Sequence, residues 1–200
     1  KLYKLKSYGK NEKINMDYII TKTPKYIKKI GQYNYCQLKD MILPETVAID
    51  LETTELKPIL GDIFAIQIGT GVNNYLIHCY DENYVPQDVF PYLKDKLLIG
   101  HNITFDLGFF YKYGFYPEKV KDTFIASKIL YNGLKEYRHD FGTVFERELG
   151  INYDKSEQKN INKIKLSTSK SIEYCFNDVD RLIELYTHLE NQFTDKRDMS

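Results

Sequence analysis

Residues 47–52 read Val-Ala-Ile-Asp-Leu-Glu, an apolar run that ends in two carboxylates. The run follows Pro44 and is closed by the pair Thr53-Thr54, so the sequence predicts a central β-strand. Residues two apart on a strand point to the same face, and we therefore expect Asp50 and Glu52 to converge. Packed carboxylates repel one another unless a cation balances them, and oxygen ligands suit Mg²⁺ or Mn²⁺. On its own, an Asp-x-Glu pair more often simply faces solvent.

A second acidic stretch, His101-Asn102-Ile103-Thr104-Phe105-Asp106, follows a strand predicted over 97–99. Gly100 ends that strand, and the spacing of apolar residues predicts a helix over 104–113. Asp106 then lies in the first helical turn, where the helix dipole favours a carboxylate as well as a metal would. Taken alone, Asp106 fits an ordinary helix-start residue. Asn102 fits a cap or turn residue and a residue near a bound substrate equally well.

A third stretch, Tyr174-Cys175-Phe176-Asn177-Asp178, lies within a helix predicted over 171–189 by an apolar stripe of period near 3.6. Residues four apart on a helix share a face, so the Tyr174 phenol and the Asp178 carboxylate lie one turn apart. Both flank the apolar stripe, from where they can reach over a sheet while the helix packs on the core. An isolated acidic residue at such a flank is more often solvated.

The remaining pattern predicts an α/β fold with a mixed five-stranded sheet flanked by helices. Strands over 63–69 and 75–78 are joined by a connection too short for a crossover helix, so they are expected to be antiparallel. A further strand lies near Val120. The C-terminal half is mostly helical, with helices over 122–130 and 139–149. Weaker signals indicate a short strand at 18–20 and a helical turn at 25–30.

Length and composition favour one domain over residues 1–200, with a core at about 18–190. Residues 1–17 form a lysine-rich segment, yet the net charge is zero, which argues against coating nucleic acid by charge alone. The three cysteines lack CxxC spacing, and no apolar stretch is long enough to span a membrane. We therefore expect an intracellular protein that is not secreted, located in the cytoplasm or at a nucleoid, an organelle or a viral replication site. A start at lysine suggests a piece of a longer chain.

Together the three acidic motifs resemble those of the DnaQ-like, or DEDD, exonuclease superfamily in its tyrosine-bearing DEDDy branch. The resemblance runs from about Tyr18 to Leu189 and is strongest to the proofreading exonuclease domains of family A DNA polymerases. Ribonuclease D is a more distant likeness. Supporting stretches are 65–69, 120–123 and 149–158. Family A relatives tend to carry a tryptophan soon after the last stretch, where this chain reads Asn160-Ile161-Asn162-Lys163.

The resemblance implies a ribonuclease H-like fold and stepwise hydrolysis of phosphodiesters from a 3′ end to nucleoside 5′-monophosphates. It implies two divalent cations, Mg²⁺ or Mn²⁺, in a two-metal hydrolysis. Asp50, Glu52 and Asp178 would bind mainly the first cation, with Asp50 shared and Asp106 supporting the second through water. Tyr174 would orient the attacking water.

Substrate contacts are expected first at Thr53, Thr54 and Leu56, where the resemblance implies backbone amides and an apolar wedge around the terminal nucleotide. Asn102 and Phe105 are further candidates. Aromatic residues at helical spacing, here Phe105 and Phe109, more often belong to the core. A lysine-rich loop could bind phosphates or be solvated; its lysines are Lys155, Lys159, Lys163 and Lys165.

The predicted partner is the 3′ end of single-stranded DNA. The chain is expected to be either part of a family A polymerase, with a polymerase domain in the same natural chain, or a freestanding relative. A ribonuclease D-like enzyme that trims RNA would use the same metal site and is the main alternative. A noncatalytic nucleic-acid-binding module is the second alternative, and four retained acidic residues with a tyrosine argue against it. No membrane partner is expected.

Overall fold

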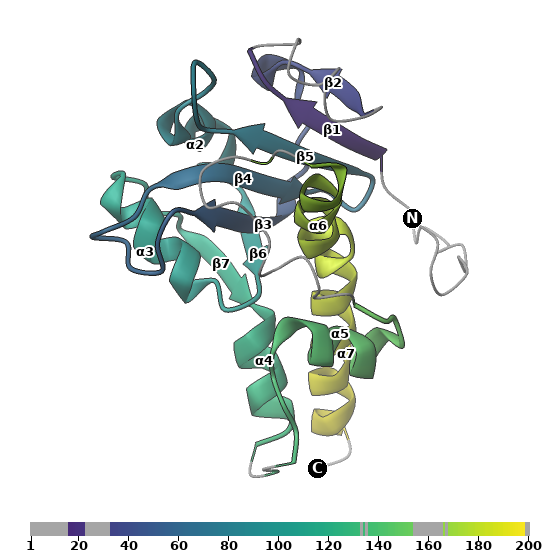
Figure 1. Ribbon diagram of the computed structural model, residues 1–200. Coiled ribbons are helices and arrows are strands. Elements are labelled where there is room, and N and C mark those ends of the chain that lie inside the picture. Colours follow the sequence, from purple (N-terminus) through teal and green to yellow (C-terminus); the bar gives the residue numbers. More distant parts are fainter. Residues whose placement is uncertain are drawn as a thin grey trace.

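The computed structural model describes residues 16–22, 33–132, 134, 136–153, 166 and 168–198. Within them, seven strands form one mixed sheet in the order β2-β1-β5-β4-β3-β6-β7 (Figure 1). The strands are β1 (Met16–Ile20), β2 (Asn34–Cys36), β3 (Thr46–Thr53), β4 (Ile63–Gly69), β5 (Asn73–His78), β6 (Leu97–Gly100) and β7 (Lys119–Asp122).

Helices cover both faces of this sheet (Figure 1). They are α2 (Pro86–Leu93), α3 (Thr104–Lys112), α4 (Thr123–Leu130), α5 (Phe141–Leu149), α6 (Ser169–Asp180) and α7 (Leu182–Asp198), with a 3₁₀ turn at Leu38–Asp40. A mixed sheet flanked by helices confirms the predicted fold class. Helix α2 was not predicted from the sequence; it begins at Pro86 and carries Pro91 inside a helix of only eight residues.

The sheet has two strands more than the five predicted. Strand β1 pairs in parallel with β5, and β2 pairs in parallel with β1, which extends the sheet at the β5 edge. Ile19 and Ile20 of β1 are fully buried, so this edge contributes to the core. Strand β2 is three residues long and mostly exposed, which is why no alternation of apolar residues indicated it.

Strand β3 lies inside the sheet, antiparallel to β4 and parallel to β6. Its side chains alternate between the two faces. Val47 and Ile49 pack in the cluster that includes α2 and α3, whereas Ala48 packs in the cluster that includes α4, α5 and α7. Asp50 and Glu52 share the parity of Ala48 and so face the side of the sheet that α6 covers.

The predicted helix over 171–189 is in fact two helices, α6 and α7, separated at Arg181 (φ −124°, ψ 17°). Helix α6 packs on β4 and β5, while α7 packs against α4 and α5. Asn74 Nδ2 donates to Asp180 Oδ1 at 2.7 Å and ties the end of α6 to β5. The apolar stripe continues across the break, so periodicity could not reveal it.

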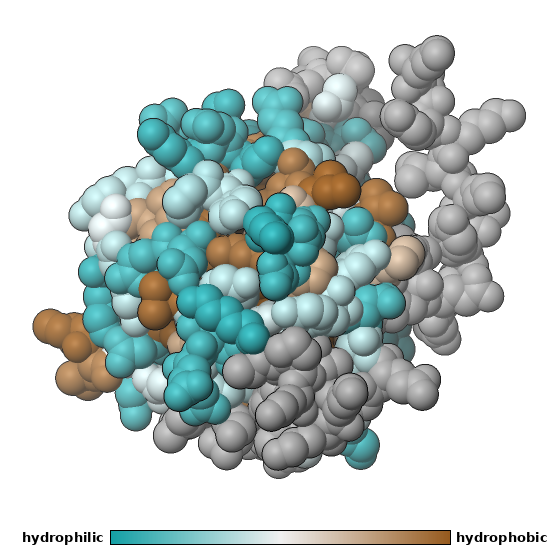
Figure 2. Space-filling model, turned by 90° about the horizontal axis from the view of Figure 1, so that it is seen from above, coloured by the Kyte–Doolittle hydropathy of each residue, from teal (hydrophilic) through white to brown (hydrophobic). Residues whose placement is uncertain are grey.

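Most of the face seen in Figure 2 is hydrophilic, with apolar residues in separate patches. Among the described helices, none is both long and apolar enough to cross a bilayer. The helical turn predicted at 25–30, most of the lysine-rich segment 1–17 and the four loop lysines from 155 to 165 lie outside the described residues.

Candidate active site

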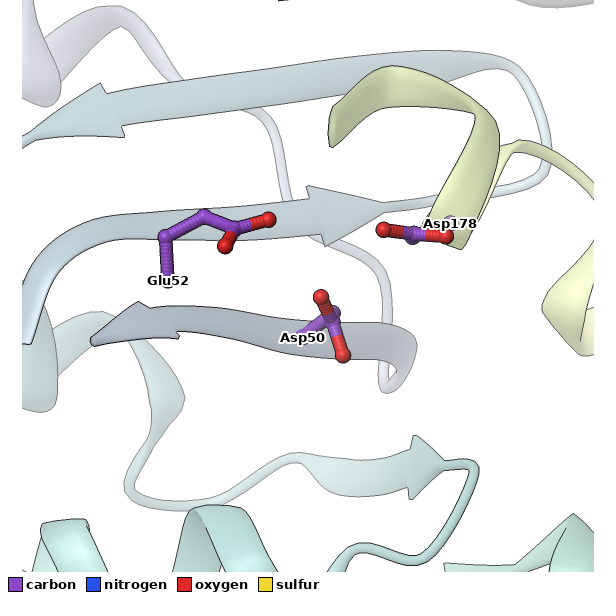
Figure 3. A group of neighbouring side chains, drawn as sticks. All are labelled: Asp50, Glu52 and Asp178. Carbon is purple, nitrogen blue, oxygen red and sulfur yellow. The ribbon is translucent and has the colours of Figure 1, made fainter. Parts of the chain in front are cut away.

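Three carboxylates from two distant parts of the chain converge above the sheet (Figure 3). Asp50 and Glu52 extend from β3, and Asp178 extends from α6 toward them. One oxygen atom from each of the three lies within 4.8 Å of the others. The predicted convergence of Asp50 with Glu52, and of both with Asp178, is therefore present in the structure.

Two neighbours fix the orientation of Glu52. Gln67 on β4 is fully buried, and its Nε2 donates to Glu52 Oε1 at 3.1 Å. The Cys175 thiol on α6 donates to the same oxygen at 3.6 Å. Sequence reasoning missed both roles, although Gln67 carried a usable signal as a polar residue in an otherwise apolar buried strand.

Burial and mutual repulsion make this cluster costly to ionise. Burial raises the pKa of Asp50 well above its usual range, and Asp178, Asp106 and Glu52 raise it further. Burial likewise raises the pKa of Asp178 strongly and that of Glu52 to about 7. Among the described residues that line the surrounding cleft there is no lysine or arginine to offset these charges.

Asp106, the fourth predicted acidic residue, lies outside the cluster of three. It occupies the first turn of α3 as predicted, is buried, and contributes to the raised pKa of Asp50. Its Oδ1 is buried without a hydrogen-bond partner among the described residues. A buried carboxylate oxygen without a donor normally requires a cation or a water.

This donor set fits a hard divalent cation. The groups available are carboxylate oxygens, they are clustered, and they lack a basic neighbour in the described cleft. Oxygen-only sites of this kind suit Mg²⁺ or Mn²⁺ rather than soft metals. Asp50, Glu52 and Asp178 could hold one cation directly, and the unpartnered oxygen of Asp106 is available to a second through water.

Two tyrosines complete the carboxylate end of the cleft. Tyr174 lies one helical turn before Asp178, as predicted, and burial together with Asp178 and Asp50 raises its pKa well above the usual range. The Tyr153 hydroxyl donates to Asp178 Oδ1, and its ring lies 6.4 Å from that of Tyr174. Tyr153 was not predicted, because it lies between α5 and α6 where no periodic pattern marks a functional position.

The cleft has a volume of about 750 Å³ and includes four of the five predicted substrate-contact residues, namely Thr53, Leu56, Asn102 and Phe105. Thr54 is not among the lining residues. The Thr54 amide donates to the Asp62 carbonyl at 2.9 Å, and the Thr54 hydroxyl accepts from the Asp62 amide at 2.9 Å. Thr54 therefore joins the two ends of the loop over 54–62. Phe109 is fully buried in the core.

Comparisons with known proteins place this geometry among nucleases. Residues 24–194 match a family model described as 3′-5′ exonuclease. DNA polymerase I of Aquifex aeolicus is 33% identical over 151 residues, which is 74% of this chain and 24% of that protein. The chain thus spans about a quarter of the length of this relative.

Solved structures share the fold at lower identity. Brucella melitensis NrnC with bound Mg²⁺ has a TM-score of 0.67 at 21% identity, covering 91% of this chain and 83% of that one. The Aedes aegypti Nibbler EXO domain has a TM-score of 0.66 at 16% identity, covering 90% of this chain and 89% of that one. At these identities the likeness concerns the fold.

Proposed function

The chain belongs to the 3′-5′ exonuclease family, and from this premise we propose that it removes nucleotides one at a time from the 3′ end of single-stranded DNA. The products would be nucleoside 5′-monophosphates. We further propose that the 200 residues form one domain and that it proofreads for a family A DNA polymerase, in the same natural chain or as a separate relative.

The observation that carries the hydrolytic proposal is the cluster of Asp50, Glu52 and Asp178 in a cleft beside Tyr174. The preference for DNA rests on the DNA polymerase relative at 33% identity. Its polymerase context is part of the proposal, because the match covers 24% of that protein.

Asp50, Glu52 and Asp178 are proposed to hold the first divalent cation, with Asp106 supporting a second. When bound, such cations supply a nucleophile at neutral pH and stabilise the leaving 3′ oxygen. The protein's own contribution is to hold the ligands still. Gln67 orients Glu52, and Tyr153 donates to Asp178.

Tyr174 is proposed to orient the attacking water. Its pKa is raised by burial and by the neighbouring carboxylates, so the phenol stays protonated at neutral pH. A neutral phenol can donate one hydrogen bond and accept another, but it is a poor general base. Tyr174 therefore positions the water without removing its proton.

The test compares matched single strands of DNA and RNA, labelled at the 5′ end, with Mg²⁺ and with excess chelator. We expect a ladder that shortens from the 3′ end, faster on DNA, and no cleavage in chelator. A 3′ phosphate should slow the reaction. Preferential digestion of RNA would instead support the ribonuclease D-like alternative, and cutting of a circular single strand would exclude an exonuclease.

A further inference from the structure

A row of aromatic rings runs from the carboxylate cluster to the starts of α4 and α5. From the cluster outward the rings belong to Tyr174, Tyr153, Phe141, His101 and Phe124, and all five line the same cleft. Successive centroids are 6.4, 4.9, 5.2 and 5.7 Å apart. Each of these side chains is half-buried, so each stays partly accessible from the cleft.

Hydrogen bonds hold the outer part of this aromatic row in place. His101 Nδ1 lies 2.9 Å from Thr123 Oγ1, and its Nε2 lies 2.9 Å from the His139 carbonyl. Because both ring nitrogens are engaged, the imidazole plane is fixed.

Helix caps position the two outer phenylalanines in the same way. Asp122 Oδ1 accepts from the Phe124 amide at 2.9 Å and starts α4. Asp140 caps α5: its Oδ1 accepts from the Thr143 amide at 3.4 Å and its Oδ2 from the Thr143 hydroxyl at 2.8 Å, which places Phe141 at the first helical residue. Rings on capped helix ends form a preorganised surface, which lowers the cost of ordering on binding.

We propose that Phe141, His101 and Phe124 form a stacking site for the nucleobases of a single strand, on the 5′ side of the nucleotide held at the carboxylates. This inference rests on the proposed function and extends it from the reacting linkage to the strand that precedes it. Base–aromatic stacking tolerates any sequence, since every base has a π-face. The site is therefore predicted to be indifferent to base identity but to require a base.

The charges of the cleft support stacking over ionic binding. The described charged residues that line it are all acidic: Asp50, Glu52, Asp140 and Asp178. The described lining offers a phosphate no lysine or arginine to pair with, whereas its rings offer a base a surface to stack on. Lys128 Nζ lies 5.0 Å from the Phe124 ring centroid, which places a positive charge at the outer end of the row.

A double-mutant cycle between ring and base tests the site directly. Wild type and the variants Phe141→Leu and Phe124→Leu would be titrated with a 5′-fluorescein DNA strand in Ca²⁺, reading anisotropy. The strands are intact or carry one abasic residue at the second, third or fourth position from the 3′ end. Stacking is worth about 1–3 kcal/mol per base, or about 5- to 150-fold in Kd.

We expect each leucine variant to weaken binding of the intact strand at least fivefold. At one of the three abasic positions, loss of the base should weaken binding by the wild-type protein at least fivefold. The same loss should weaken binding by the leucine variant less than twofold, because the variant already lacks the contact between ring and base. Tyr116→Leu is the matched control: Tyr116 is exposed, stacks on Tyr111 and lies outside the cleft lining. It should leave binding unchanged.

Thermal unfolding and the variant Phe141→Tyr guard against a folding artefact. A tyrosine keeps the ring and should restore binding if stacking is the cause. Additive losses at every abasic position, or a failure of Phe141→Tyr to bind better than Phe141→Leu, would overturn the stacking site.

If ring and base are coupled but Mg²⁺ yields no shortened strands, the proposed exonuclease fails while the stacking site stands. If the strands are shortened but the losses in affinity are purely additive, the stacking site fails while the proposed exonuclease stands. If no binding is detected at all, both proposals fail.

Discussion

At the scale of single residues, Asp50 and Asp178 combine a structural cost with a functional role. Each is packed beside like charges, and each pKa is raised first by burial. Without a cation, alanine at either position would remove a buried, repelled carboxyl from the fold.

We therefore expect Asp50→Ala and Asp178→Ala to abolish hydrolysis, by at least about a hundredfold, since losing only a residue that supports a metal ligand already costs about 10–100-fold. The melting temperature in chelator should stay the same or rise. Activity on labelled strands and thermal unfolding check both halves of the prediction. Wild-type rates in a preparation free of contaminating nucleases would contradict the proposed metal site.

Tyr174→Phe separates water orientation from metal binding. The phenyl ring keeps the packing, and the loss is confined to the hydroxyl. We expect a rate lower by about 10–100-fold with the same ladder of products. This loss lies at or below the low end of the range for groups that transfer a proton, because Tyr174 orients the water without taking its proton. The apparent Mg²⁺ affinity should change less than the rate: the Tyr174 hydroxyl also bonds Asp178, but Tyr153 still donates to that carboxylate in the variant. Unaltered single-turnover rates would remove the role proposed for this tyrosine.

Tyr153→Phe should have the opposite signature. Its hydroxyl donates to Asp178, so its loss should loosen a metal ligand without touching the water. The Mg²⁺ concentration for half-maximal rate should rise about tenfold, whereas the rate at saturating Mg²⁺ stays within about threefold. Tyr131→Phe is a suitable control, because Tyr131 donates to Glu148 away from the cleft. An unchanged Mg²⁺ dependence would exclude this positioning role.

The predictable site residues are those whose spacing repeats with a secondary-structure period. Asp50 and Glu52 two apart on a strand, and Tyr174 and Asp178 four apart on a helix, are of this kind. Tyr153 reaches Asp178 from an irregular segment, where neither periodicity nor composition limits the direction of the side chain. Its position depends on tertiary packing against Phe141.

At the scale of elements, the end of α6 approaches the end of β4 very closely. A Cβ on Gly69 would lie 2.4 Å from the Val179 carbonyl oxygen, so only glycine fits. Val179 adjoins Asp178, and the distance between β4 and α6 therefore determines where this carboxylate lies over β3.

Gly69→Ala is expected to push α6 away from the sheet. Stability should fall by about 1–3 kcal/mol, as for other overpacked sites, and activity should fall with it because Tyr174 and Asp178 both move. Gly71→Ala is the control in the same turn. It has φ +82° with open space around it, so strain should cost about 1 kcal/mol while activity is kept. Equal effects of the two substitutions on activity would contradict this close-contact account.

Helices and strands were predictable where the pattern of apolar and capping residues in the sequence matches the place of the element in the fold. The run 47–52 is apolar because it is an inner strand, and Asp122 caps α4 as its sequence position indicates. The break at Arg181 was not predictable, because one continuous apolar stripe is buried along both helices. The two helices differ in direction only because α6 packs on the sheet and α7 packs against α4 and α5. Strand β2 was missed because pairing with β1, rather than its own side chains, makes it a strand.

At the scale of the whole molecule, the fold brings together carboxylates 128 residues apart in sequence, from β3 and α6. The hydrophobic clusters on both faces of the sheet must therefore outweigh the repulsion that this site introduces. A bound cation would remove most of that repulsion, so metal binding and folding stability should be linked.

The sign of this linkage follows from the raised pKa values. A carboxyl whose pKa rises on folding binds its proton more tightly in the folded state, so the metal-free protein loses stability as pH rises through that range. For Glu52 the window runs from about 4.5 to about 7. A divalent cation needs the ionised carboxylates, and its stabilising effect should therefore grow over the same window.

We accordingly predict that Mn²⁺ at about 100 times its Kd raises the melting temperature by about 5–10 °C at pH 8, which corresponds to about 2.7 kcal/mol in a chain of this size. At pH 5 the same concentration should give a much smaller shift, because protons compete for the carboxylates. The measurement is the difference in melting temperature between Mn²⁺ and chelator at each pH, which cancels titration elsewhere in the protein. Asp178→Ala should lose most of the shift at pH 8. A shift that is as large at pH 5 as at pH 8, or that survives in Asp178→Ala, would mean that the cation binds somewhere other than the carboxylate cluster.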